Sequence, residues 1–363
     1  MRIVVKIGTS SVTAGDGEVN SIAIEKLCTE VVNARRLGHE VVIVTSGAVT
    51  AGLQILGRDR PSDARTLQAV SAVGQIELMR VYREVLHRHG VIAGQALLAP
   101  LDFMVRQQYV HARGTVERLL EMGVVPVINE NDAIADDELR FGDNDRLAAL
   151  VSNLISAELL VLLTDTPGLL TADPRLQPDA SLIEEITEID RTLEALAGGS
   201  SGSSGSGGMA AKLASARMAT WTGVRAVIAA ADRPGVLQDA IEGRPGIGTI
   251  VHPHSRKLSA RKLWIAFAVK PEGTLVVDDG ARGALVGRAT SLLPAGLVDV
   301  IGDFGADSAV EITTTDGTVF AKGLVRVPAD VLRSTLGLRT NDLPPGVIHE
   351  TVHRDDLVVL VDD

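Results

Sequence analysis

The 363-residue sequence contains one cysteine and few aromatic residues. Cys28 has no partner for a disulfide within the chain, and no Cys-x-x-Cys pair or Cys/His cluster suggests a structural zinc site. We therefore expect Cys28 to be a small buried apolar residue. Because aromatic residues make up only 2% of the chain and hydrophobic residues 45%, the core has to consist mainly of Val, Leu, Ile and Ala. This composition is typical of buried parallel strands covered by helices and favours an α/β fold.

Long apolar segments are also missing. The chain opens with MRIVVKIG, which has none of the parts of a secretory signal peptide, and no apolar run reaches the roughly 20 residues of a membrane helix. These patterns predict a cytoplasmic protein. Positive charge is scarce, because 35 Lys and Arg residues face 46 Asp and Glu residues, and the net charge of −11 opposes non-specific binding to nucleic acid or anionic lipid. A site for an anionic ligand must therefore create its positive field locally.

The common nucleotide-binding signatures are absent as well. The sequence has no GxxxxGK[ST] loop, no GxGxxG that opens the first helix, and neither the HRD nor the DFG motif of protein kinases. A nucleotide site, if the chain has one, must be built differently.

Short β-branched runs alternate with helix-length amphipathic segments along most of the chain. The runs lie at 3–7, 41–45, 91–98, 124–129, 159–164 and 224–230. Their continuous rather than alternating hydrophobicity indicates strands that are covered on both faces. We therefore predict an α/β fold with a mostly parallel sheet sandwiched by helices.

The sequence pattern changes toward the C-terminus. The chain is also longer than a protein with a single hydrophobic core usually is. After residue 270, short strand-like pieces are separated by Gly, Asp and Pro, which predicts a small β-rich domain. We place a first domain at 1–255, a basic linker that contains Trp264 at 256–270, and the β-rich domain at 271–363.

Polar residues follow four of the predicted strands directly, at 6–10, 45–48, 129–132 and 164–165. Each cluster alone could be a turn or a helix cap. Because ligands of open α/β sheets bind at the carboxyl ends of the strands, the four together favour one binding crevice.

Two lysines stand out. Lys6 interrupts an apolar strand, so it either lies in solvent at the strand end or faces an anion, since an unpaired buried ammonium group is costly. Lys212 follows the tract 198–208, in which every residue is Gly or Ser. That tract is either a plain linker or a mobile loop whose backbone N–H groups bind phosphate. The segment 140–146 adds acids beside a predicted helix, either as a helix cap or as carboxylates that hold lysines or a substrate ammonium group.

Taken together, these motifs resemble the amino-acid kinase family. The matching segments are VVKIGTSSVT (4–13), VIVTSGAVTAG (42–52), AVGQ (72–75), VPVINENDAIA (125–135), GDND (142–145), LLTDTPGLLTADPR (162–175) and GSGGMAAK (205–212). The INENDA and GDND pair resembles one branch in particular, the bacterial glutamate 5-kinases. The tail, with TLVVDDGA and SLLPAGLVDVIGDF, is similar to a PUA domain.

The resemblance implies roles for individual residues. Lys6 and Lys212 would contact the transferred phosphate, and Asp145 would orient both lysines. Glutamate would be bound by Ser46, Asp132 and Asn144, with Gly47 lining the site. Besides Lys6, the residues around ATP would be Thr164, Asp165, Ser206, Gly207, Gly208, Met209, Ala210, Ala211 and Lys212. Ser206 and Ala211 depart from the threonines usual in the family, and only Ser206 keeps the hydroxyl group.

The resemblance also implies a reaction and partners. The chain would use ATP and Mg²⁺, without a dedicated metal site, to phosphorylate the γ-carboxylate of L-glutamate in the first step of proline biosynthesis. Inhibition by proline, handover of the product to glutamyl phosphate reductase and a homo-oligomer are further expectations. The alternatives are another amino-acid kinase activity or RNA binding through the PUA domain. The charge of 271–363, with 7 Lys/Arg against 15 Asp/Glu, argues against RNA.

Overall fold

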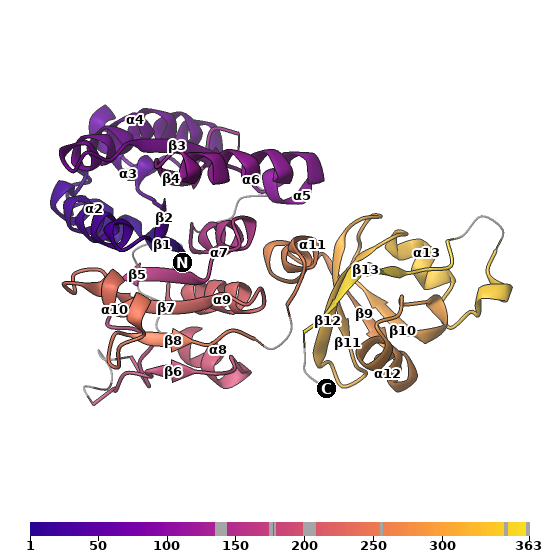
Figure 1. Cartoon of the computed structure of the whole chain (residues 1–363). Helices are drawn as coiled ribbons and strands as arrows, with labels where there is room; N and C mark the ends of the chain where they lie inside the picture. The colour runs from indigo at the N-terminus through magenta and orange to yellow at the C-terminus, as the bar shows by residue number, and fades with distance from the viewer. Residues whose placement is uncertain are drawn as a thin grey trace. The chain divides into compact units, whose positions relative to one another are not determined.

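The computed structural model describes residues 1–134, 144–173, 177, 179–198, 208–254, 257–344 and 348–360. The chain divides into two compact units, Met1–Lys257 and Leu258–Asp363, each with its own sheet (Figure 1). The predicted combination of an α/β fold with a smaller β-rich unit is confirmed. The limits of the predicted linker at 256–270 stay a prediction.

The described part of the N-terminal unit contains an eight-stranded sheet in the order β3-β4-β2-β1-β5-β7-β8-β6. Its strands are β1 (Arg2–Ile7), β2 (Glu40–Val44), β3 (Ala93–Leu98), β4 (Val125–Glu130), β5 (Leu159–Thr164), β6 (Glu185–Ile186), β7 (Arg225–Ala230) and β8 (Thr249–Val251). Neighbouring strands run parallel except for the antiparallel pair β7–β8. The carboxyl ends of the central parallel strands therefore meet at one edge of the sheet.

Helices cover both faces of this sheet (Figure 1). They are α1 (Thr9–Val12), α2 (Ser21–Arg36), α3 (Ala48–Leu56), α4 (Ala64–Arg88), α5 (Leu101–Met104), α6 (Arg106–Glu121), α7 (Asn144–Leu154), α8 (Arg191–Gly198), α9 (Met209–Thr220) and α10 (Val236–Glu242). Buried side chains of α2, α4 and α10 share one core cluster with the sheet. Helix α7, which contacts β1, and helix α9, which contacts α7, cover the other face.

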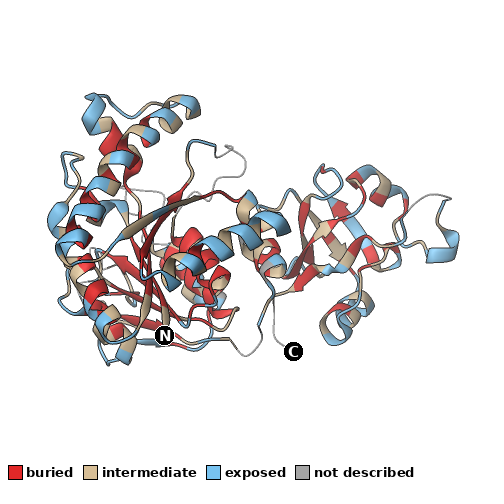
Figure 2. Ribbon diagram, turned by 45° about the horizontal axis from the view of Figure 1, so that its top comes forward, coloured by how far each residue is buried: buried red, intermediate tan, exposed pale blue. Residues whose placement is uncertain are grey.

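Burial explains the continuous apolar runs of the sequence. Every residue of β4 and β5 is buried, as is all of β1 after Arg2, and the central strands are red in Figure 2. Cys28 on α2 is fully buried as well, and burial raises the pKa of its thiol to about 12. The expectation of a small buried residue at position 28 is confirmed. Among the described residues, no helix is long and apolar enough to cross a membrane.

The C-terminal unit contains a five-stranded sheet in its described residues, in the order β10-β9-β11-β12-β13. Only β9–β11 is a parallel pair. The elements are α11 (Ala260–Leu263), a π-helix (Trp264–Ala268), β9 (Gly273–Val277), α12 (Asp279–Arg288), β10 (Leu297–Ile301), β11 (Ala309–Thr313), β12 (Val319–Val325), α13 (Ala329–Ser334) and β13 (Val352–Val359), with short 3-10 turns at Pro294–Gly296 and Thr340–Asp342.

Part of the segment suggested as a linker packs within this unit. Ile265 of the π-helix is fully buried and shares a small cluster with Val358 of β13. The ammonium group of Lys322 on β12 donates a hydrogen bond to the carbonyl oxygen of Val269, just after the π-helix.

Candidate active site

Lys6 lies close to the carboxyl end of β1, on the face of the sheet that α7 and α9 cover. Side chains alternate along a strand, so Lys6 points away from the cluster that contains Ile3, Val5 and Ile7. Only 3% of Lys6 is exposed. The alternative of a lysine in solvent at the strand end is therefore wrong.

Three charged side chains meet there; we call them the lysine centre. Lys6 Nζ lies 2.6 Å from Asp145 Oδ1, and Lys212 Nζ lies 3.0 Å from Asp145 Oδ2. Asp145 is the second residue of α7 and Lys212 is in the first turn of α9. All three are buried, and Asp145 is fully so. One carboxylate thus holds two ammonium groups that come from a strand and a helix far apart in sequence.

The lysine centre carries more positive than negative charge. Burial alone would raise the pKa of the Asp145 carboxyl, but the ammonium groups of Lys6 and Lys212 outweigh burial and hold its pKa below the ordinary value. Asp145 is therefore ionised, and two cations share one anion. In a chain with a net charge of −11, this is the local positive field that an anionic ligand needs.

An amide cluster adjoins the lysine centre. Asn144 precedes Asp145, and its Nδ2 donates to the Thr45 carbonyl at 2.5 Å, to Asn129 Oδ1 at 2.6 Å and to Ser46 Oγ at 3.2 Å. Asn129 belongs to β4, whereas Thr45 and Ser46 follow β2. The structure thus joins the ends of two neighbouring strands to the start of α7.

Gly47 shapes the entry into α3 from the same strand end. It is the N-cap residue, with a left-handed φ of 99°. A Cβ atom there would lie 2.8 Å from Val12 Cγ2, so a side chain is excluded by space as well as by backbone conformation. The free N–H groups at the start of α3 therefore lie next to Ser46, where they favour an anionic group.

Asp132 follows β4 and is held by α4. Ser71 Oγ of α4 donates to Asp132 Oδ2 at 2.6 Å. One turn later on the same helix, Gln75 Oε1 accepts a hydrogen bond from Asn129 Nδ2 at 2.8 Å. Helix α4 therefore contacts both Asp132, which is predicted to bind the substrate, and the amide cluster.

The residues predicted to surround ATP lie at the same sheet edge. Thr164 ends β5, and its hydroxyl donates to Asp165 Oδ1 at 3.1 Å. The register of β5 against β1 pairs Leu163 with Ile7, the last residue of β1, so Thr164 lies one position beyond this pair, at the carboxyl end of β1. Gly208 caps α9, and Met209, Ala210 and Ala211 form the turn before Lys212. Ser206 and Gly207 lie outside the described residues.

Sequence reasoning missed the residues that support this site. Thr45 and Asn129 lie in the polar clusters predicted to form a binding crevice but were given no individual role, and Ser71 and Gln75 were not predicted to take part in binding. Thr45, Ser71 and Asn129 each contact a predicted site residue, and Gln75 contacts Asn129. The signal for Asn129 was its place in the polar cluster at the end of a predicted strand, and Gln75 lies in the AVGQ motif. Ser71 carries no signal, because a serine inside a helix is read as a surface position.

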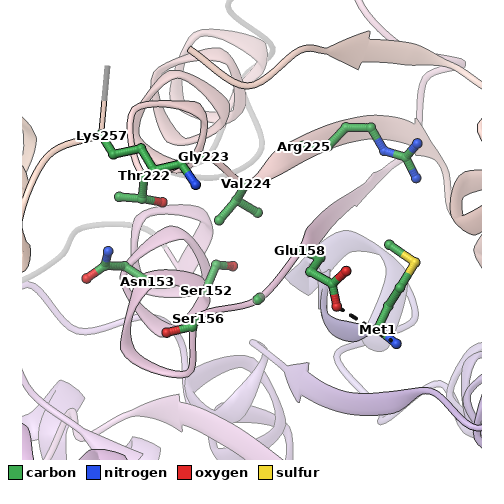
Figure 3. A pocket seen from close by; sticks show the side chains of 11 residues that line it. Met1, Ser152, Asn153, Ser156, Glu158, Thr222, Gly223, Val224, Arg225 and Lys257 are labelled. Atoms are coloured by element: carbon green, nitrogen blue, oxygen red, sulfur yellow. Dashed lines mark ion pairs between the residues drawn. The ribbon is translucent and has the colours of Figure 1, made fainter. Parts of the chain in front are cut away.

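A separate pocket of about 600 Å³ lies at the other edge of the sheet (Figure 3). Met1 precedes β1, Glu158 precedes β5 and Arg225 begins β7, so the pocket opens at the amino ends of these strands. Arg225 already donates to the carbonyl oxygens of Ala240 and Ile241. None of the predicted site residues lines the pocket. Because ligands of such sheets bind at the carboxyl ends, the site proposed below is the edge with the lysine centre.

Comparison with known proteins agrees with this geometry. Residues 1–230 match the model of the amino acid kinase family, and residues 273–344 match that of the PUA domain. A glutamate 5-kinase of Geobacter sulfurreducens is 43% identical over 99% of this chain and 97% of its own length. A glutamate 5-kinase of Deinococcus radiodurans is 43% identical over 99% of this chain and its full length. The chain belongs to the glutamate 5-kinase branch of the amino-acid kinase family. The predicted membership and the predicted PUA domain are thereby confirmed.

A solved structure supports the fold of this kinase. The carbamate kinase of Giardia lamblia, bound to AMP-PNP, has a TM-score of 0.50 and 18% identity and covers 70% of this chain and 98% of its own. The likeness concerns the fold alone.

Proposed function

We propose that the chain transfers the γ-phosphoryl group of ATP to the γ-carboxylate of L-glutamate, which gives γ-glutamyl phosphate and ADP. The observation that carries the proposal is the lysine centre, two buried ammonium groups held by one carboxylate beside an uncharged amide cluster. A buried site with excess positive charge suits a reaction in which negative charge spreads over a transferred phosphoryl group.

The nucleophile needs no general base. The γ-carboxylate of glutamate has an ordinary pKa of about 4.3, so it arrives ionised at neutral pH. One of its oxygens forms the new bond to phosphorus while the bond from phosphorus to the β,γ-bridging oxygen breaks, and ADP leaves with that electron pair. No proton moves in this step. Lys6 and Lys212 stabilise the charge on the phosphoryl oxygens, and Asp145 positions both.

ATP would lie between the start of α9 and the end of β5. The free N–H groups of the first turn of α9 favour phosphate, and among the described residues no atom beyond its chain neighbours and its own helix lies within 4 Å of where a Cβ atom of Gly208 would stand. Thr164, Asp165 and the segment from Ser206 to Lys212 would surround the nucleotide. Among the described residues, no group of three or more His, Cys, Asp or Glu side chains could hold a metal ion. Mg²⁺ is commonly bound through substrate phosphates, so we propose that it enters with ATP.

Glutamate would be held on the opposite side of the lysine centre. Ser46 and the start of α3 at Gly47 offer hydroxyl and N–H donors to a carboxylate. Asp132 would repel a carboxylate but would pair with the α-ammonium group. Asn144 connects the carboxylate-binding group at Ser46 with the amine-binding group at Asp132. It donates to Ser46 directly and is linked to Asp132 through the amide cluster and helix α4. The free amine of the substrate is thus recognised as well as its carboxylates.

Recognition of the amine gives the test of substrate identity. N-acetylglutamate lacks the ammonium group, so its binding would leave Asp132 unpaired, at a cost on the order of 1–3 kcal/mol or more. We predict that kcat/KM for N-acetylglutamate is lower than that for glutamate by about tenfold to a hundredfold or more. ADP release measured with glutamate, N-acetylglutamate, aspartate, carbamate and UMP checks this. Comparable values for glutamate and N-acetylglutamate would remove the assignment.

The assignment also implies a metabolic setting. We propose that γ-glutamyl phosphate, an unstable acyl phosphate, passes to glutamyl phosphate reductase as the first step toward proline, and that proline inhibits by binding at or over the glutamate site. A homo-oligomer is proposed on the same family grounds. RNA binding through the C-terminal unit is a weaker candidate, because acidic residues outnumber basic ones there by 15 to 7 between 271 and 363.

A further inference from the structure

The proposed glutamate-binding residues lie at the carboxyl ends of β2 and β4, and we call this group the substrate edge: Ser46, Asp132 and Asn144, with Thr45 and Asn129. One face of α4 contacts the substrate edge at three points. Ser71, Gln75 and Tyr82 lie four and seven residues apart, which places them on one side of the helix. Ser71 donates to Asp132, and Gln75 accepts from Asn129. The hydroxyl group of Tyr82 lies 2.9 Å from Thr45 Oγ1. Helix α4 therefore supports the substrate edge from behind.

The hydrogen bonds from Gln75 have a fixed direction. The backbone N–H of Glu130 can only donate, and it donates to Asn129 Oδ1 at 2.9 Å, so Asn129 Nδ2 must be the atom that faces Gln75 Oε1. Asn129 Oδ1 also accepts from Asn144 Nδ2 at 2.6 Å. The carbonyl oxygen of Thr45 can only accept, and it too is bonded to Asn144 Nδ2. In this amide relay, Gln75–Asn129–Asn144, backbone groups thus set the amide orientations of Asn129 and Asn144, and Gln75 Oε1 is the acceptor that Asn129 Nδ2 then requires.

The relay determines which polar side-chain atom of Asn144 remains available to bind a ligand. Its Nδ2 is engaged by three acceptors. Its remaining polar atom is Oδ1, which accepts no hydrogen bond from the described residues. A carbonyl oxygen can accept from an ammonium group but cannot bind a carboxylate oxygen.

Gln75 lowers the stability of the folded protein relative to an apolar residue at this position, so a purely structural role does not explain it. It is only 8% exposed, and within the described residues its Nε2 has no hydrogen-bond partner. A buried amide nitrogen without a partner is destabilising, whereas an apolar side chain of similar size would avoid that penalty. The useful end of Gln75 is Oε1, which orients Asn129.

We infer that Gln75 is a positioning residue for substrate amine recognition: through Asn129 it helps to hold the Asn144 carbonyl oxygen toward the α-ammonium group of the substrate, where that oxygen acts together with Asp132. The inference rests on the proposed glutamate kinase activity. Without the acceptor at position 75, Asn129 Nδ2 is left without its hydrogen bond in a buried site, so Asn129 is held less firmly, and so is Asn144, which donates to it. The oxygen that would meet the ammonium group is then no longer held in one position.

The test compares ligands with and without the amine in the full-length enzyme. Gln75→Met removes the acceptor at nearly constant volume, and Gln75→Glu keeps an acceptor oxygen in place. Glutarate lacks the ammonium group, and its inhibition constant against glutamate reports binding of the carboxylates alone. We expect Gln75→Met to lower kcat/KM for glutamate about tenfold, through KM, while KM for ATP and the inhibition constant of glutarate change by less than about twofold. Gln75→Glu should restore most of the loss.

Two further variants keep the test decisive. Tyr82→Phe removes a buried hydrogen bond from the same helix face but outside the relay, and it should leave the ratio between glutamate and glutarate unchanged. Should Gln75→Met fail to fold, Gln75→Asn withdraws the acceptor by one methylene group with less disturbance, and the same split is expected. Equal losses for glutamate and glutarate, or no loss, would overturn the inference. Absence of glutamate phosphorylation by the wild-type enzyme would instead overturn the proposed function itself.

Discussion

Asp145 is the residue on which the lysine centre depends. Its carboxylate is fully buried and is shared by Lys6 and Lys212, whose ammonium groups are themselves nearly inaccessible to water. Burial opposes the charged form of Asp145, but the two ammonium groups prevail and its pKa is lowered. Removing the carboxylate would leave two like charges buried side by side, which is the costly way to break a buried ion pair.

We therefore predict that Asp145→Asn lowers the free energy of unfolding by about 3–5 kcal/mol at neutral pH. Because the folded-state pKa is depressed, the stabilisation by Asp145 is complete above the ordinary aspartate pKa of about 3.9 and is lost as the pH falls through the folded-state value. The difference between wild type and variant should thus be constant from pH 7 to about pH 5 and shrink at more acidic pH. Urea unfolding across this pH range measures it.

Asp63→Asn is the matched control. Asp63 also has a lowered pKa, chiefly because it accepts a hydrogen bond from the Thr66 backbone N–H at the start of α4, but it is fully exposed. Asparagine caps a helix as well as aspartate does, so little change is expected. A loss for Asp145→Asn no larger than that for Asp63→Asn would contradict the role given to Asp145.

A charged residue inside an apolar segment could be predicted from the sequence to belong to the site. The polar residues that hold the site residues in place could not. Lys6 stood out because a lysine inside an apolar strand needs an anion. Gln75 and Ser71 look like ordinary polar positions of a helix, since their partners come from 54 and 61 residues further along the chain. Only the packing of α4 against the strand ends gives them a role.

At the scale of elements, the pair α3–α4 sets the position of the substrate edge. The helices approach so closely at two glycines that a Cβ atom on Gly74 would lie 1.9 Å from the Ala48 carbonyl oxygen, and one on Gly52 would lie 2.0 Å from the Val70 carbonyl oxygen. Ala48 begins α3, next to Gly47 and Ser46. A side chain at position 74 would therefore push the start of α3 away from the amide cluster.

We predict that Gly74→Ala destabilises the protein by about 1–3 kcal/mol and raises KM for glutamate more than KM for ATP. Gly114→Ala is the control, because Gly114 lies inside α6 and, among the described residues, no atom outside its own stretch of helix lies within 4 Å of the added Cβ. That change should stabilise the protein by about 0.5–1 kcal/mol. Thermal unfolding and steady-state kinetics of both variants check the prediction, which fails if Gly74→Ala behaves like Gly114→Ala.

Prediction of elements from the sequence succeeded where a strand is long and buried. The runs read at 3–7, 159–164 and 224–230 became β1, β5 and β7 with limits that differ by at most one residue. The antiparallel β8 and the short β6 were missed, because strands of two or three residues carry too little pattern. Their pairing is set by tertiary contact with β7 and with each other.

At the scale of the whole molecule, the N-terminal unit contains all the described residues assigned to catalysis and binding. Its sheet and core are complete within Met1–Lys257, which is the condition for folding alone. The C-terminal unit has its own core and contributes none of the proposed site residues. We propose that it adjusts regulation or contacts between subunits.

A chain that ends after Lys257 should therefore keep glutamate-dependent ADP release, with kcat within about threefold of that of the full-length chain. Its oligomer size or its inhibition by proline should differ. Size-exclusion chromatography with light scattering, and inhibition curves for proline, measure both properties. If the shortened chain matched the full-length chain in both, the regulatory role of the C-terminal unit would be refuted.

The central claim is that two buried lysines stabilise the γ-phosphoryl group of ATP during its transfer to an already ionised carboxylate. Hydroxylamine converts an acyl phosphate into a stable hydroxamate, so the most direct measurement is γ-glutamyl hydroxamate formed with ATP, Mg²⁺ and glutamate by wild type and by Lys212→Ala. We predict one hydroxamate for each ADP in wild type and a loss of about a hundredfold or more in kcat for the folded variant. ADP release without hydroxamate, or wild-type turnover by Lys212→Ala, would contradict the account.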